Sequence, residues 1–217
     1  MVIPKVFLIS GMGADERLFR HLDLSGFEAI PVIWIEPQHD DTLATYATRL
    51  IRQFSIKAGD SVIGVSLGGM MATEIAKQLE LKHVILISSI KSPAEAPAYY
   101  NFFKSIPMYK LLSGEFMIKA SFLFKPVMGK MAGIHADLFY SMLKNTSPTF
   151  LKWSIGASLN WDNTIVPPNI THLIGDADKV FNYKRIKYAI VIRGGDHMMV
   201  FNRSKQISPI VREVLSK

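Results

Sequence analysis

A serine between glycines is the strongest chemical signal in this chain. Residues 64–68 (GVSLG) have the pattern GxSxG, and Gly69 follows. The pattern lies between a β-prone run and an amphipathic segment, so Ser66 is expected on a strained strand-to-helix turn with its hydroxyl above the sheet edge. Side chains at the flanking glycines would collide with neighbouring backbone on such a turn. The motif therefore predicts that Ser66 is a nucleophile; the alternative is a glycine-rich turn with a solvated serine.

A serine nucleophile needs a base, and the base needs an acid that orients it. Among the six histidines, His197 follows the end of the last β-prone run, where it can meet Ser66 at one sheet edge. Asp178, in the loop after the preceding run, is the predicted acid because it lies far enough into that loop to reach an imidazole. Asp176 is the alternative, although an aspartate so close to the strand end often braces the turn. Asp196 is expected to be structural.

Two backbone amides are predicted to bind the oxyanion of an acyl-transfer reaction. The amide of Leu67 lies at the start of the predicted helix, where the helix dipole favours negative charge. The second donor is expected from the loop after the first strand, residues 10–13 (SGMG), and the amide of Met12 is our choice.

These residues are positioned by segments that alternate between strand and helix patterns, as in an α/β protein. Apolar runs without alternation suit parallel strands that are covered by helices on both faces. Helices are predicted over 42–54, with Asp41 or Thr42 as the cap, over 67–79, and at the C-terminus from Ser208 and Pro209 onward. The predicted strands are 5–10, 29–35, 61–65, 83–88, 169–174 and 188–192.

Residues 91–167 interrupt this alternation and contain no clear strand. We interpret them as a helical cap or lid inserted after the fourth predicted strand, while residues 1–90 and 168–217 form the core. A segment this apolar is expected to bury itself against a neighbour. Its aromatic and methionine side chains offer an apolar pocket wall, with helix packing as the alternative role for most of them. They include Tyr99, Phe102, Phe103, Met108, Phe116, Met117, Phe122, Phe124, Met128, Met131, Phe139, Met142, Phe150, Trp153 and Trp161.

Length and composition limit the classes of protein to consider. A chain of 217 residues is long enough for one sizeable core and short for two. It has no cysteine, which excludes disulfides, a thiol nucleophile and cysteine-based metal sites. The histidines lack metal-ligand spacing as well, so we expect neither a metal nor a cofactor.

The net charge and the apolar runs bear on partners and location. The charge of +7, from 25 basic and 18 acidic residues, is scattered, so no nucleic-acid partner is expected. No stretch approaches the roughly 20 apolar residues that span a bilayer, and the first residues lack a signal-peptide pattern. A cytoplasmic protein without a membrane partner is the expectation, and the sequence leaves the oligomeric state open.

Together these motifs resemble those of the α/β-hydrolase superfamily, over nearly the whole chain. Residues 64–70 (GVSLGGM) and 194–198 (GGDHM) are most similar to the branch of plant methyl esterases and hydroxynitrile lyases. In that branch the residue after the histidine tends to be lysine in lyases and methionine in esterases. Met198 therefore favours ester hydrolysis. The chain departs from the branch at Ser10, where a histidine is usual, and at Val65, where a histidine is common.

The resemblance implies the α/β-hydrolase fold, and the six β-prone runs predict a six-stranded, mostly parallel sheet flanked by helices, where the family usually has eight strands. It also implies a cofactor-free serine hydrolase that cleaves a small, largely apolar carboxylic ester through Ser66, His197 and Asp178. Thioesters and amides remain open as substrates. The alternatives are a lyase or haloperoxidase-like activity on the same residues, or a ligand-binding protein that kept the fold without turnover.

Overall fold

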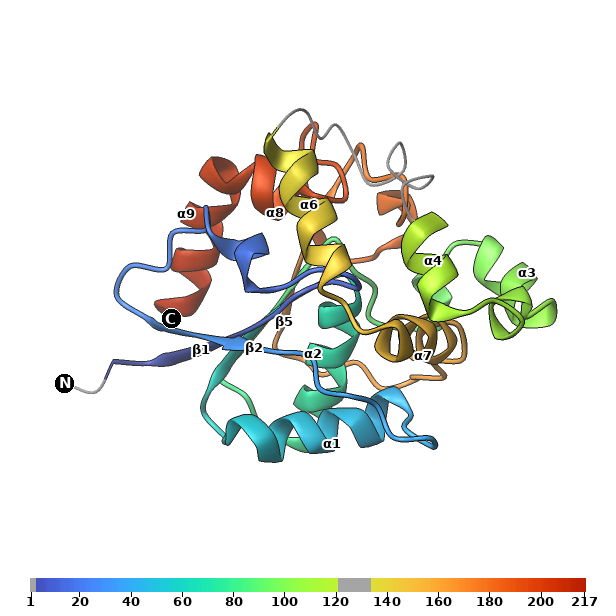
Figure 1. Cartoon of the computed structure of the whole chain (residues 1–217). Coiled ribbons are helices and arrows are strands. Elements are labelled where there is room, and N and C mark those ends of the chain that lie inside the picture. The colour runs from blue at the N-terminus through green and yellow to red at the C-terminus, as the bar shows by residue number, and fades with distance from the viewer. Residues whose placement is uncertain (1–2, 121–133) are drawn as a thin grey trace.

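The centre of the protein is one six-stranded sheet, seen in a computed structural model that describes residues 3–120 and 134–217 (Figure 1). All neighbouring strands are parallel, in the order β2-β1-β3-β4-β5-β6. This confirms the predicted α/β class and the six parallel strands. The strands are β1 (Lys5–Ile9), β2 (Glu28–Val32), β3 (Ser61–Val65), β4 (His83–Ile87), β5 (Ile170–Gly175) and β6 (Ala189–Ile192).

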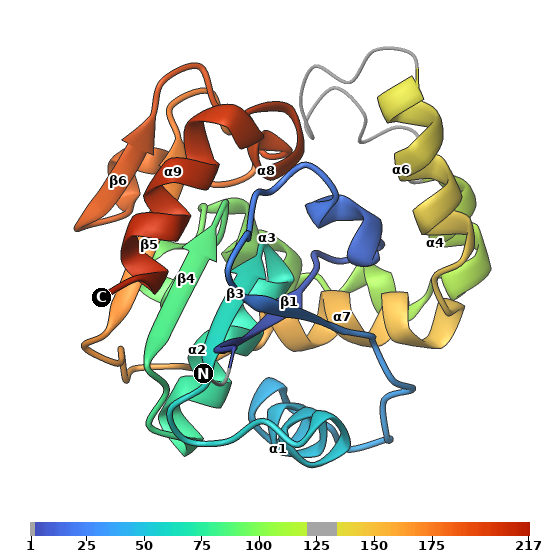
Figure 2. The same cartoon turned by 90° about the vertical axis from the view of Figure 1, so that its left-hand side faces the viewer.

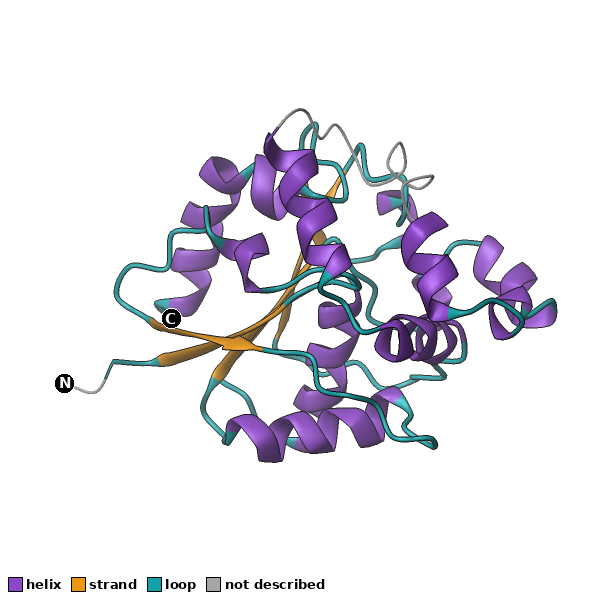
Figure 3. Cartoon of the chain, in the orientation of Figure 1, coloured by secondary structure: helices purple, strands orange, loops and turns teal. Residues whose placement is uncertain are grey.

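Helices cover both faces of the sheet, because successive strand residues point to opposite faces. In β1, Phe7 and Ile9 join the hydrophobic cluster on one face, whereas Val6 and Leu8 join the cluster on the other. The first cluster receives side chains from α1 (Leu43–Phe54), α2 (Leu67–Gln78) and α7 (Pro148–Leu159) (Figures 1 and 3). The second receives them from η1 (Glu16–Phe19), α6 (Ile134–Lys144), α8 (Met199–Asn202) and α9 (Ser204–Leu215) (Figure 2).

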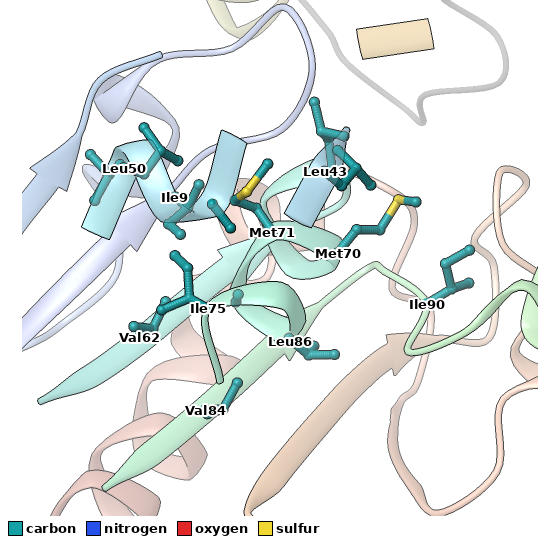
Figure 4. Packing of buried hydrophobic residues seen from close by; sticks show 14 of the residues in the cluster. Ile9, Leu43, Leu50, Val62, Met70, Met71, Ile75, Val84, Leu86 and Ile90 are labelled. Carbon is teal, nitrogen blue, oxygen red and sulfur yellow. The ribbon is translucent and has the colours of Figure 1, made fainter. Parts of the chain in front are cut away.

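The first cluster holds α2 against the sheet. Met70, Met71 and Ile75 on α2 are buried among strand residues such as Val62 and Leu86 (Figure 4). Because α2 begins directly after β3, this packing fixes the direction in which the β3–α2 turn faces.

The predicted start of the helix at residue 42 is confirmed, and the predicted start of the last helix is not. Helix α1 begins as predicted, and Thr42 caps it by accepting a hydrogen bond from the amide of Thr45. The prediction that the last helix begins at Ser208 and Pro209 is wrong, since α9 begins at Ser204 and contains Pro209. Proline has no N–H, so Pro209 cannot donate the helical hydrogen bond to the carbonyl of Lys205. The helix tolerates Pro209 because both residues are exposed.

The segment between β4 and β5 is helical in its described part, where it contains no strand. It comprises η2 (Pro93–Glu95), α3 (Tyr99–Ser105), η3 (Met108–Lys110), α4 (Gly114–Ala120), α6 and α7. Four of its predicted pocket or packing residues, Phe122, Phe124, Met128 and Met131, lie outside the described residues.

The expectation that this segment buries its apolar side chains is wrong for several residues of its first half, although Met117 there is buried. Phe150 and Trp161 are buried, but Phe102 and Phe116 are more than half exposed. The difference follows from position, because Phe150 of α7 lies within the first hydrophobic cluster, whereas Tyr100 of α3 packs against its edge and no residue of α3 is buried.

The side chain of Tyr46 in α1 contacts two other parts of the fold. Its side chain is fully buried, and its hydroxyl accepts a hydrogen bond from the amide of Ile35 and donates one to the carbonyl of the same residue. Its ring stacks on Trp153 of α7 at a centroid distance of 4.4 Å. One side chain thus links α1, the segment after β2 and α7.

Replacing Tyr46 with Phe should destabilise the protein by about 1–3 kcal/mol, because both backbone groups of Ile35 lose their partner. Urea unfolding would measure the change. Tyr188→Phe is the matched control, since Tyr188 is 97% exposed and should leave the free energy of unfolding unchanged. Equal stability of the two variants would contradict this role of the Tyr46 hydroxyl.

Candidate active site

Ser66 occupies a strained turn between β3 and α2. Its backbone has φ of 54° and ψ of −117°, a conformation that non-glycine residues rarely adopt. A Cβ atom on Gly64 would overlap the carbonyl group of Gly68, and one on Gly68 would overlap the carbonyl oxygen of Ile9. Glycine is therefore required at both positions for the first turn of α2 to pack this closely, as the sequence pattern predicted.

Three side chains from distant parts of the sequence form one hydrogen-bonded chain. Nε2 of His197 lies 3.0 Å from Oγ of Ser66. Nδ1 of the same ring lies 3.0 and 3.2 Å from the two carboxylate oxygens of Asp178. His197 and Asp178 are only 4% and 8% exposed. The structure thus brings Ser66, His197 and Asp178 together at the carboxyl ends of β3, β5 and β6.

The loops that carry Asp178 and His197 contact each other through their backbones. Gly175 lies so close to Gly195 that a Cβ on Gly175 would overlap the Gly195 carbonyl. The amide of Ala177 donates to that same carbonyl at 2.9 Å. This contact sets the separation of the two loops.

The three aspartates near the site have different partners. Asp178 accepts hydrogen bonds from the amides of Val180 and Phe181, which hold its carboxylate toward the imidazole. Asp176 instead accepts from the amide of Gly194 and braces the turn. Asp196 accepts from the amide of Met198 and from the side chain of Asn202, in agreement with its predicted structural role.

His197 and His172 are both buried, and their surroundings differ. The ring of Phe181 packs edge-on against His197 at a centroid distance of 5.6 Å. His172 lies within β5, where burial and the charge of Lys91 lower its pKa to about 3. His172 therefore stays neutral near pH 7 and lies away from Ser66. Within residues 3–120 and 134–217, no group of His, Asp and Glu side chains is arranged to hold a metal ion.

One predicted oxyanion donor follows Ser66 in the chain, and the other lies in a loop whose backbone passes beside Ser66. Leu67 is the first residue of α2, where an amide has no partner inside the helix. Met12 follows Gly11, whose backbone lies beside Ser66: a Cβ on Gly11 would be 3.4 Å from the Ser66 Cβ. Hydrogen bonds from the Ser10 hydroxyl to the Ala14 carbonyl, and from the Ala14 amide to the Gly11 carbonyl, shape this loop.

Sequence reasoning missed Ser89, which contacts the strained turn. Its buried hydroxyl donates a hydrogen bond of 2.6 Å to the carbonyl of Ser66. A Cβ on Gly69 would overlap this hydroxyl, which explains why a glycine also follows the GxSxG pattern. The available signal was its position just after β4, at the same sheet edge as the other site residues.

Comparison with known proteins places the chain in a family. Residues 6–208 match the model of the alpha/beta hydrolase family. No curated protein sequence is similar enough to be identified as a relative.

Solved structures resemble the whole fold at low sequence identity. A hydrolase from Pseudomonas aeruginosa PA01 has a TM-score of 0.74 and 17% identity, over 99% of this chain and 90% of the other. An esterase from Exiguobacterium antarcticum has a TM-score of 0.73 and 15% identity, over 99% and 92%. A structure from a study of carboxylesterases of Nitrososphaera gargenis has a TM-score of 0.69 and 18% identity, over 98% and 90%. With a family match across most of its length and the same fold, this chain belongs to the alpha/beta hydrolase family.

Proposed function

We propose that this protein is a cofactor-free serine hydrolase that cleaves small, largely apolar carboxylic esters. The observation that carries the proposal is the continuous hydrogen-bonded chain from Ser66 through His197 to Asp178. Family membership and the esterases among the similar folds agree with it. Met198, beside His197, is buried in the second hydrophobic cluster and supplies no positive charge for a departing cyanide, so hydrolysis is favoured over cyanohydrin cleavage.

In the proposed mechanism Ser66 attacks the ester carbonyl while Nε2 of His197 takes the hydroxyl proton. The amides of Met12 and Leu67 bind the oxyanion of the tetrahedral intermediate, helped by the dipole of α2. His197 then gives its proton to the leaving alcohol, and an acyl group remains on Ser66. Water, activated by the same ring, releases the acid and restores Ser66. Asp178 holds the ring tautomer and stabilises its positive charge throughout.

A small cavity lies beside the loop that follows β1 and carries Met12. It has a volume of about 190 Å³ and is lined by Ser10, Val32, Trp34, Met142 and Phe150, among others. Its lining does not include Ser66 or His197, so this space lies next to the proposed site and is not the space directly above the nucleophile. Two of these lining residues, Met142 and Phe150, belong to the inserted segment 91–167, which we propose as the cap that selects substrate.

Replacing Ser66 with Ala should lower kcat/KM for p-nitrophenyl butyrate at least about 10³-fold, because the nucleophile is lost. The parent protein should also be labelled by a fluorophosphonate, and the variant should not. Activity within twofold of the parent would exclude Ser66 as the nucleophile. An unlabelled, inactive parent would instead indicate a fold that binds without turnover.

Replacing Asp178 with Asn should lower kcat about 10³- to 10⁴-fold, because the amide cannot hold the productive ring tautomer or stabilise the imidazolium. Asp176→Asn is the matched control two residues away. Its side-chain oxygen can still accept from Gly194, so activity should change by less than about threefold. Equal losses in both variants would contradict the assignment of Asp178 as the acid.

Ser89 is proposed as a positioning residue, because its hydroxyl holds the carbonyl of Ser66. Ser89→Ala should lower kcat by about 5- to 30-fold, the effect of about 1–2 kcal/mol, and leave KM nearly unchanged. Ser88→Ala is the control, since the neighbouring Ser88 hydroxyl is buried without a partner among the described residues. If Ser89→Ala lowers thermal stability but leaves kcat unchanged, the residue has only a structural role.

A further inference from the structure

One end of the molecule carries an apolar surface that the proposed chemistry does not use. It is formed by α3, η3 and α4, which lie at the outer edge of the fold in Figure 1, and we name it the α3–α4 face. Large exposed apolar surfaces mark sites of interaction with proteins or membranes. Its exposed apolar side chains are Tyr99, Phe102, Phe103, Ile106, Met108, Leu111, Leu112 and Phe116.

Helix α3 is the most unusual part of this face. None of its seven residues is buried, although four of them are aromatic. Leu111, just after η3, is 87% exposed. Tyr100 packs against the first hydrophobic cluster, but Phe102 and Phe103 are 56% and 42% exposed. A second apolar surface is needed to remove these two rings from water.

Basic side chains are distributed within the same face. Lys104, Lys110 and Lys119 are exposed between the apolar residues, and Glu115 is the single acidic residue from 99 to 120. None of the three lysines pairs with a carboxylate in the described part of the chain. Long lysine side chains can lie along apolar surface while the ammonium group stays in a polar layer. The local charge has the same sign as the net charge of +7.

We propose that the α3–α4 face binds the surface of a membrane that contains anionic lipids. Aromatic and leucine side chains would enter the boundary between headgroups and acyl chains, and the lysines would contact anionic headgroups. The centre of a protein–protein interface is typically depleted in lysine. Lysines interleaved with exposed rings therefore favour a lipid surface over a protein partner.

This mode of binding needs no membrane-spanning segment. Among the described helices, none is long and apolar enough to cross a bilayer. The sequence-based expectation of no membrane partner rested on the lack of such a segment, and contact with the bilayer surface is compatible with that lack.

The face also adjoins the loop that holds the proposed acid. The hydroxyl of Tyr99 donates to the carbonyl of Val180, and the amide of Val180 donates to Asp178. If the proposed function holds, binding places the site next to the lipid surface, where amphiphilic esters concentrate. Membrane binding itself does not depend on catalysis.

Flotation with lipid vesicles tests the proposal on the full chain. The parent protein should float with vesicles of phosphatidylcholine and phosphatidylserine at 7:3, and far less with phosphatidylcholine alone. High salt should weaken binding, because the lysine contribution is screened. A triple variant, Phe102→Ser, Leu111→Ser and Phe116→Ser, should lose at least about tenfold in the fraction bound. Lys104→Glu with Lys110→Glu should lose the preference for the anionic vesicles.

The matched control is Ile33→Ser, Tyr188→Ser and Val191→Ser, which removes exposed apolar side chains elsewhere and should bind as the parent does. Circular dichroism should be unchanged in the face variants. Loss of hydrolysis without loss of vesicle binding would bear only on the proposed function.

Absence of flotation by the parent, or equal binding by the triple variant, would overturn the membrane proposal. A parent dimer that the triple variant converts to monomer, without vesicle binding, would show that a second copy covers the face.

Discussion

The close approach of the first turn of α2 to the sheet is the constraint on which the site depends. Gly64 and Gly68 allow helix and strands to meet with no side chain between them, and the chain reverses over one strained residue. The strain at Ser66 is held by interactions around it: α2 is anchored by Met71 and Ile75, and Ser89 holds the Ser66 carbonyl. This strained turn places the hydroxyl of Ser66 and the first amides of α2 close together.

Parallel topology explains why residues so far apart in sequence meet. Strands β3, β5 and β6 all end at one edge of the sheet, so the residue that follows each strand lies near the others. This rule, applied to the sequence, selected His197 from six histidines and placed it with Ser66. The same rule does not distinguish Asp178 from Asp176 as the acid, because both residues follow β5 within three positions. The amides of Val180 and Phe181 donate hydrogen bonds to Asp178, which distinguishes it from Asp176. The amino-acid composition of the loop does not predict these hydrogen bonds.

Other features could not be read from the sequence, for identifiable physical reasons. Ser89 acts through a hydrogen bond across two strand ends, which only the register of β3 and β4 determines. The position of Pro209 inside α9 depends on the exposure of Lys205, which is a tertiary property. Helices α3 and α7 both carry aromatic residues, yet Phe150 of α7 is buried in the core whereas Phe102 and Phe103 of α3 are exposed. Composition alone does not predict which apolar helix is buried against the rest of the fold.

The inserted helices leave the sheet after β4 and return at β5, and these two strands are hydrogen-bonded neighbours. The stretch between them is therefore anchored on two neighbouring strands, at the carboxyl end of β4 and the amino end of β5, and the backbone contact between Gly175 and Gly195 involves residues outside it. The exposed residues of α3 and α4 can consequently change over evolutionary time while the spacing of Ser66, His197 and Asp178 is preserved, whereas α7 is held by its packing on the first hydrophobic cluster. The architecture separates the part of the gene that can diversify from the part that must be conserved.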